Sequence, residues 1–376
     1  MLLSEDHQAV QDAVRQFVQA EITPHAAAWD KSGQFPAAQL RGLAALGCYG
    51  VAVPTEYGGA GLDYLALALM LEEIAAGDGA TSTIVSVNNC PVCSILMAFG
   101  NEDQKQRFLK PLARGDMLGA FCLTEPHVGS EAGGLKTSAV LDGDDYVLNG
   151  VKQFITSGKN GDVAIVMAVT EKAAGKRGIS AFLVPTTTPG YTVARVEDKM
   201  GQHASDTAQI LFDNCRVPAA NRIGDEGQGL KIALSGLEGG RIGIASQALG
   251  MARAAFEVAL AYSKDRQAFG VPIFQHQAVQ FKLADMATQI EATRQLIWHA
   301  ACLKDAGRPC LKEAAMAKLM ASEMAEAVCS GAIQVLGGYG YLSDFPVERI
   351  YRDVRVCQIY EGTSEVQKIL IGRALA

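Results

Sequence analysis

The feature that most constrains the fold of this chain is a change of apolar periodicity along its length. Residues 119–222 contain short β-branched runs broken by Gly, Asp, Asn and Pro, whereas the segments on either side repeat their apolar residues at helical spacing. A block of about one hundred residues is the size of a small domain. We therefore predict a multidomain α+β fold with an N-terminal helical domain (1–118), a central β-barrel-like domain (119–222) and a C-terminal four-helix bundle (223–376).

The helices and strands have recognisable signals. Ser4 is a suitable N-cap because its hydroxyl can accept a hydrogen bond from a free amide of the first turn. Glu5 and Asp6 follow in that turn, where the helix dipole favours negative charge. Thr363 or Ser364 can cap the last helix. Further helices are expected at 37–46, 65–76, 93–99, around 279–297 and at 311–336. Strands are expected at 146–148, 163–170, 179–184 and 209–212, and Asn149–Gly150 is interpreted as a hairpin turn.

The composition argues against several classes of protein. The 376 residues have a net charge of −7, so there is no electrostatic footprint for nucleic acid. The longest apolar runs are far shorter than the ~20 residues that cross a membrane, and no secretory signal is visible. Nine scattered cysteines are typical of free thiols in a reducing compartment. Since the chain begins with Met1, we expect a cytoplasmic bacterial protein, or a mitochondrial matrix protein if it is eukaryotic.

The common nucleotide and metal motifs are absent. Lys159 follows a glycine but precedes Asn160 instead of Ser or Thr, so there is no Walker A loop, and no glycine cluster has the spacing of a Rossmann fingerprint. Cys90 and Cys93 form a lone Cys-x-x-Cys without a second pair, and the six histidines are dispersed. We therefore expect no metal site.

Four polar segments together carry a family resemblance, although each alone is typical of a loop or a helix cap. They are FCLTEPHVGS at 121–130, RQAFG at 266–270, QVLGGYGY at 334–341 and IYEGTSE at 359–365. In this order, and over essentially the whole chain, they resemble the signatures of the acyl-CoA dehydrogenases. Segments 86–89, 240–250 and 281–287 are most similar to the short-chain subgroup, whose representative substrate is butyryl-CoA.

The resemblance implies FAD-dependent dehydrogenation of a short-chain acyl-CoA to a trans-2-enoyl-CoA, a step of fatty acid β-oxidation. The implied partners are the acyl-CoA substrate, electron-transfer flavoprotein and further copies of the chain in a homotetramer that shares its flavins between subunits. One alternative is a dehydrogenase for branched acyl groups, isobutyryl- or 2-methylbutyryl-CoA, because Phe154 resembles some branched-chain relatives. An acyl-CoA oxidase and a non-catalytic relative are further alternatives, and the presence of Glu361 argues against the latter.

The resemblance also assigns site residues. Glu361 matches the catalytic base, and burial in an apolar pocket would raise its pKa toward that of a general base. The matched substrate-binding residues are Ser130, Glu238, Arg241 and Gly362. The matched FAD-binding residues are Phe121, Leu123, Thr124, Ser130, Phe154, Ile155, Thr156, Arg266, Phe269, Gln277, Gln334, Gly338, Thr363 and Glu365.

Four positions depart from the family pattern, and one of them is Ala268, which lacks the hydroxyl that some relatives have. Phe154 stands where most relatives have Trp, which leaves an aromatic surface for the flavin without an indole. Glu131 replaces the usual Asp, and His127 replaces a common Gly. None of these changes removes the implied base or the flavin-binding segments.

Overall fold

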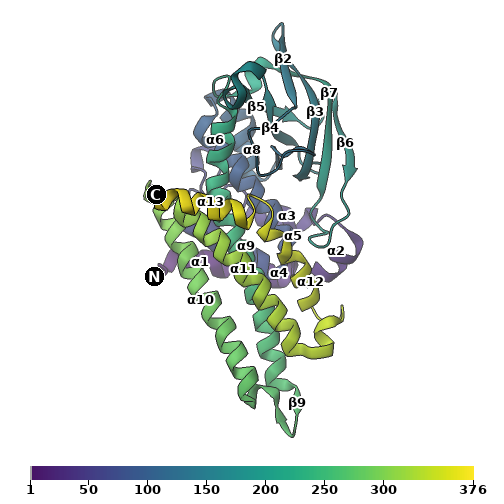
Figure 1. Ribbon diagram of the computed structural model, residues 1–376, viewed down its shortest axis with the longest axis vertical. Helices are drawn as coiled ribbons and strands as arrows, with labels where there is room; N and C mark the ends of the chain where they lie inside the picture. Colours follow the sequence, from purple (N-terminus) through teal and green to yellow (C-terminus); the bar gives the residue numbers. More distant parts are fainter. Residues whose placement is uncertain (1) are drawn as a thin grey trace.

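A computed structural model describes residues 2–376 and shows helices, then a sheet, then helices along the chain (Figure 1). The N-terminal elements are α1 (Glu5–Glu21), α2 (Ala26–Ser32), α3 (Ala37–Ala45), η1 (Thr55–Tyr57), α4 (Tyr64–Gly77), α5 (Gly79–Val87), the π-helical turn η2 (Asn88–Cys93), α6 (Ser94–Phe99), α7 (Glu102–Gln104), the π-helical turn η3 (Lys105–Leu109) and α8 (Lys110–Arg114). The predicted cap of α1 is present, since Ser4 Oγ accepts a hydrogen bond from the His7 amide at 3.2 Å.

The sheet and the C-terminal helices follow. The sheet elements are β1 (Gly119–Cys122), β2 (Ser138–Asp142), β3 (Asp145–Thr156), β4 (Val163–Val169), η4 (Lys172–Gly178), β5 (Ile179–Pro185), β6 (Tyr191–Val196), β7 (Thr207–Pro218), η5 (Ala219–Asn221) and β8 (Arg222–Ile223). The C-terminal elements are α9 (Gly229–Asp265), β9 (Gln267–Ala268), β10 (Val271–Pro272), η6 (Ile273–Gln275), α10 (Gln277–Asp305), α11 (Leu311–Leu336), η7 (Gly337–Tyr341), α12 (Val347–Val354), η8 (Arg355–Gln358) and α13 (Ser364–Leu375).

Helix α4 lies inside the protein and is apolar nearly all round because it packs against α1 on one side and against α9 and α10 on the other. The stretch 79–99, which includes α5 and has a kink at Cys90, has a mean hydropathy of 1.4 and is long enough to cross a membrane. Apolar runs in the sequence did not predict it, because no single run within it is long. Since 78% of its most apolar window is buried in this protein, the stretch is accounted for as a core helix.

The eight strands form one sheet in the order β6-β7-β3-β2-β4-β5-β8, with β1 paired in parallel to β4. Alternate residues of β4 face opposite sides. Ile165 packs into a core shared with the N-terminal helices, whereas Val166 packs into a core inside the sheet domain. The sheet is therefore fixed on one face to the helices that precede it.

One turn prediction is wrong. Asn149–Gly150 lies inside β3, where the pairing with β7 shifts by one residue at Gly150, a β-bulge. The hairpin turn instead follows β2 at Asp142–Asp145, where Gly143 has φ +65°. Position 150 requires glycine because Thr137 packs directly against its backbone, and an added Cβ would lie 2.5 Å from Thr137 Oγ1. The β6 strand, 191–196, was not predicted.

The long helices α9, α10 and α11 pack side by side, and α12 and α13 pack on α11. Figure 1 shows the sheet domain at one end of the molecule and the β9 hairpin at the opposite end of these helices. The loop between η8 and α13 crosses near the middle of α11, and the candidate catalytic residue lies in this loop.

Candidate active site

The loop that carries Glu361 has a constrained backbone. Glu361 has φ +50° and Gly362 has φ +95°, so two successive residues occupy the region that favours glycine. Thr363 then caps α13, with its Oγ1 accepting from the Val366 amide at 3.4 Å. Six non-glycine residues within 2–376 have positive φ, and three of them are the predicted site residues Phe154, Phe269 and Glu361. Strained backbone of this kind is concentrated at functional sites.

The carboxylate of Glu361 is aimed at the backbone of α9. Its Oε2 is buried and has no hydrogen-bond partner among the described residues. A Cβ added at Gly240 would lie 2.1 Å from that oxygen, so only glycine at this position lets the carboxylate approach the helix. Burial raises the pKa of Glu361 to about 7, against the opposing effect of the positive charges on Arg241 and Lys318. A buried carboxyl with this pKa is a candidate general base at neutral pH.

Arg241 is buried beside this carboxylate on α9. It is 4% exposed, and within residues 2–376 its Nε and Nη1 have no hydrogen-bond partner. Burial lowers the pKa of Arg241, while the charges of Glu361 and Glu238 oppose that shift. Glu238 itself accepts from Lys304 Nζ at 3.1 Å and from Cys310 Sγ at 3.4 Å. Free donors on a buried guanidinium point to a ligand that supplies acceptors there.

Several contacts hold the loop on both sides of Glu361, and the sequence analysis did not identify the residues that make them. Lys318 Nζ donates to the Gly362 carbonyl at 2.6 Å, and Gln367 Nε2 donates to the same oxygen at 2.9 Å. On the other side, Tyr360 Oη donates to Gln247 Oε1 at 2.6 Å. A signal for Lys318 was present in the sequence, since it stands among the apolar positions of 311–336 that form the core-facing side of α11.

The predicted flavin residues of the sheet domain lie on neighbouring segments. The Gln153 amide donates to the Thr124 carbonyl at 2.8 Å, which brings the segment after β1 beside β3. Phe154 is 63% exposed next to this junction, and Thr124 and Thr156 are half-buried. Phe121 is half-buried on β1, and Leu123 is largely buried. The side chain of Ile155 packs into the core of the sheet domain, so only the backbone of Ile155 can contact a ligand. Ser130 is exposed in the loop that follows.

The loop around Ser130 is held by a buried ion pair. Lys152 Nζ lies 2.8 Å from Glu125 Oε1 and also donates to the Leu123 carbonyl at 3.1 Å. Glu125 accepts from the amides of Lys136 and Thr137 as well. Although burial opposes ionisation, the ammonium of Lys152 and these amides hold the pKa of Glu125 below its usual value.

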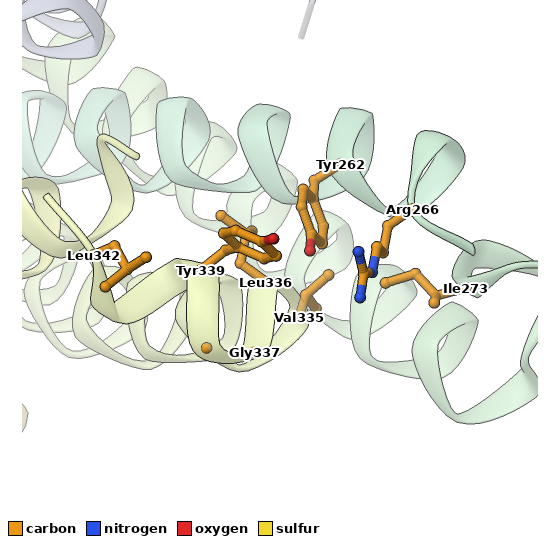
Figure 2. A pocket seen from close by; sticks show the side chains of 9 residues that line it. Tyr262, Arg266, Ile273, Val335, Leu336, Gly337, Tyr339 and Leu342 are labelled. Carbon is orange, nitrogen blue, oxygen red and sulfur yellow. The ribbon is translucent and has the colours of Figure 1, made fainter. Parts of the chain in front are cut away.

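The remaining predicted flavin residues lie at the far end of the long helices. A cavity of about 560 Å³ there is lined by Tyr262, Arg266, Ile273, Val335, Leu336, Gly337, Gly338, Tyr339 and Leu342. Figure 2 shows Arg266 at the end of α9 and Tyr339 of η7 projecting toward this cavity, and the guanidinium lies 5.7 Å from the Tyr339 ring centre. Nothing lies within 4 Å of a Cβ added at Gly337 or Gly338, so the backbone there is open to a ligand.

Gln277, Gln334 and Phe269 do not line this cavity; they are exposed on segments adjacent in sequence to its lining residues, and the Phe269 ring is 96% exposed. Along α9, the 26 residues from Gly240 to Arg266 span about 39 Å at 1.5 Å per residue. The catalytic loop and this cavity are therefore separate regions of one chain. Thr363 and Glu365 lie with the catalytic loop, at the start of α13. In the part of the chain that the structure describes, no group of His, Cys, Asp or Glu is arranged to hold a metal.

Comparisons with known proteins identify the family of this chain. The N-terminal, middle and C-terminal domains described for acyl-CoA dehydrogenases match residues 4–116, 120–215 and 227–376. The human mitochondrial short-chain specific acyl-CoA dehydrogenase is 49% identical over 98% of this chain and 90% of its own length. An acyl-CoA dehydrogenase of Bacillus subtilis is 46% identical over 100% of this chain and 99% of its own length.

Solved structures are equally similar. Butyryl-CoA dehydrogenase from Megasphaera elsdenii superposes with a TM-score of 0.97 at 43% identity and covers 100% of this chain and 99% of its own. A chain from a structure described as the electron transferring flavoprotein of Acidaminococcus fermentans has a TM-score of 0.98 at 45% identity, covering 100% and 99%. A Mycobacterium smegmatis glutaryl-CoA dehydrogenase in complex with FADH2 has a TM-score of 0.94 at 35% identity, covering 100% and 95%.

The chain belongs to the acyl-CoA dehydrogenase family. It is a flavin-dependent oxidoreductase that acts on acyl-CoA, and its cofactor is FAD. The residues present are compatible with that group. The open backbone at Gly337 and Gly338 leaves room for a pyrophosphate, Arg266 supplies a cation, and exposed Phe154 supplies an aromatic surface.

Proposed function

We propose that this protein dehydrogenates short, straight-chain acyl-CoA esters, with butyryl-CoA as the representative substrate, to the trans-2-enoyl-CoA. The observation that carries the proposal is the buried, unpartnered carboxylate oxygen of Glu361 against Gly240. The preference for short chains is supported by the names of the human relative and the M. elsdenii structure.

Glu361 is the proposed base. The α-proton of an acyl thioester is weakly acidic, so its removal needs a carboxylate whose pKa has been raised by desolvation. Burial raises the pKa of Glu361 to about 7, which keeps a large ionised fraction at neutral pH while making that fraction more basic. When bound beside this loop, FAD would supply the acceptor for the β-hydrogen, which leaves as a hydride. The α-proton remains on Glu361 until the enoyl product leaves.

Arg241 and Glu238 are proposed to meet the substrate on the α9 side of the base. The guanidinium of Arg241 is buried, and its Nε and Nη1 are free in the described chain, so acceptors on the acyl-CoA would satisfy them. Gly362 is proposed to contact the thioester from the catalytic loop. Exposed Ser130 is proposed to contact the thioester arm or the flavin pyrophosphate.

The flavin is proposed to bind between subunits of a homotetramer. Within one chain, Arg266, Gly338 and Gln334 lie far along the helices from Glu361. A single flavin that uses both groups therefore needs the cavity of one subunit and the catalytic loop and sheet domain of another. The exposed ring of Phe269 beside the cavity supports a covering partner.

Electron-transfer flavoprotein is the proposed electron acceptor. Support comes from the matched chain in the Acidaminococcus fermentans structure, whose description names that protein. The proposed location is the bacterial cytoplasm, or the mitochondrial matrix if the chain is eukaryotic. The human relative at 49% identity is described as mitochondrial.

An anaerobic absorbance titration of the FAD-loaded protein tests the substrate. Bleaching of the flavin by butyryl-CoA, and weaker bleaching by isobutyryl-CoA, is the expected result. Bleaching by isobutyryl-CoA alone would replace the straight-chain proposal with the branched-chain one. No bleaching by either substrate would reject both.

A further inference from the structure

Two lysines within residues 2–376 are completely buried, and only one of them forms an ion pair there. Lys152 is paired with Glu125 at 2.8 Å. Lys318 of α11 is 0% exposed and forms no ion pair within residues 2–376. Burying an ammonium without a paired carboxylate is costly, so a lysine at this position of an apolar helix face needs an explanation other than packing.

The single hydrogen bond of Lys318 in the described chain leads to the catalytic loop. Nζ donates to the Gly362 carbonyl at 2.6 Å, a short, charge-assisted contact. That carbonyl belongs to the residue directly after Glu361, where φ is +95°, and Glu361 itself has φ +50°. A left-handed conformation is strained at a non-glycine residue and persists only when its surroundings hold it in place.

The charge of Lys318 also acts on the carboxylate. Lys318 and Arg241 are the two cations that oppose the effect of burial on the pKa of Glu361. Burial lowers the pKa of Lys318 to about 8, so its ammonium is the major form at neutral pH. The other titratable groups that face Glu361 or Lys318 come from several elements: Arg241 on α9, Cys90 on η2, Cys357 on η8 and Glu365 on α13. Tyr360 in the loop contacts Cys357. Glu238 acts on the pair through Arg241.

We propose that Lys318 is a positioning residue for proton abstraction: its buried ammonium holds the Gly362 carbonyl and so keeps the Glu361 carboxylate aimed at Gly240. The inference rests on the proposed role of Glu361 as the base. Two consequences can be separated. The hydrogen bond sets the geometry, and the positive charge sets the pH range in which the base is ionised.

The test measures the limiting rate of flavin reduction by butyryl-CoA against pH in the FAD-loaded enzyme, by anaerobic stopped flow. Lys318→Met removes both the donor and the charge, Lys318→Gln keeps a donor without the charge, and Lys318→Arg keeps both. Lys368→Met is the matched control, because Lys368 of α13 is an exposed lysine 3.5 Å from Glu323 and its loss also removes one positive charge.

For Lys318→Met we expect a fall in the limiting rate of about tenfold or more and an upward shift of the pH midpoint of about one unit, since the opposing cation is lost. Lys318→Gln should show the upward shift with a smaller loss of rate. Lys318→Arg and Lys368→Met should keep the wild-type midpoint. If Lys318→Met does not yield holoenzyme, the comparison of Lys318→Gln with Lys318→Arg carries the test.

A merely structural lysine would give a different pattern: a lower melting temperature or FAD content with an unchanged midpoint and rate. That result overturns the inference. Glu361→Gln, assayed alongside, separates the two proposals. If Glu361→Gln is inactive while the Lys318 variants behave like wild type, only the role of Lys318 fails. If Glu361→Gln reduces its flavin at the wild-type rate, the role of Glu361 itself fails.

Discussion

Gly240→Ala is a sharp perturbation of the site because it adds one methyl group directly in front of the proposed base. The added Cβ would lie 2.1 Å from Glu361 Oε2, whereas ordinary contacts begin at 3.4 Å, so the carboxylate must retreat by about 1 Å or more. A displacement of about 1 Å between reacting groups costs about a hundredfold in rate. We therefore expect the limiting rate of flavin reduction by butyryl-CoA to fall by about two orders of magnitude.

The free energy of unfolding of the same variant should fall by no more than about 2 kcal/mol, which distinguishes misplacement of the carboxylate from unfolding. Alanine is favoured over glycine inside a helix by about 1 kcal/mol, while overpacking costs about 1–3 kcal/mol. Gly372→Ala in α13 is the matched control, since nothing lies within 4 Å of its added Cβ, and it should keep full activity. Stopped-flow reduction and thermal unfolding of both variants, each with FAD bound, make the comparison. A Gly240→Ala enzyme that reduces its flavin at the wild-type rate would refute the placement of Glu361.

Three further predictions follow from other features. The limiting rate of flavin reduction should rise with pH through a midpoint near the Glu361 pKa of about 7, because only the ionised carboxylate accepts a proton, and a flat profile from about pH 6 to about pH 8 would contradict this. Glu125→Gln leaves Lys152 buried without its counter-ion and should lower the free energy of unfolding by about 3–5 kcal/mol in urea titrations, and an unchanged value would show that the pair is dispensable. Arg266→Ala should weaken FAD retention on dialysis and reduce the tetramer fraction in analytical ultracentrifugation, whereas FAD affinity equal to wild type would exclude its assigned contact.

Much of the architecture was predictable because local signals and tertiary packing agree. The Ser4 cap, the helix at 311–336 and the strands at 163–170 and 179–184 were found from periodicity and capping chemistry. The turn prediction at Asn149–Gly150 was wrong because the same dipeptide is common in hairpin turns and in β-bulges. The close approach of Thr137, which lies on another segment, selects the bulge, and the dipeptide alone does not reveal that contact. The strand at 191–196 was missed because most of its side chains are exposed and it lacks a buried apolar face.

Candidate residues of the site could be named from the sequence, but their environment could not. Family resemblance picked out Glu361, but its raised pKa depends on α9 and α11, which no local pattern places beside it. Lys318 was overlooked for a related reason. A lysine on an apolar helix face is a signal, but its meaning depends on the Gly362 carbonyl, 44 residues further along the chain. Long-range contacts of this kind follow from tertiary packing, which propensity and spacing do not encode.

The role of Glu361 is the central claim, and Glu361→Gln tests it most directly because the amide keeps the shape of the side chain and cannot take the proton. The measurement is the rate of anaerobic flavin reduction by butyryl-CoA in purified variant and wild-type enzymes with equal FAD content. We predict that the variant keeps its FAD and its flavin spectrum while the reduction rate falls by at least about a thousandfold. A variant that reduces its flavin at a rate close to that of wild type would contradict the assignment of Glu361 as the base.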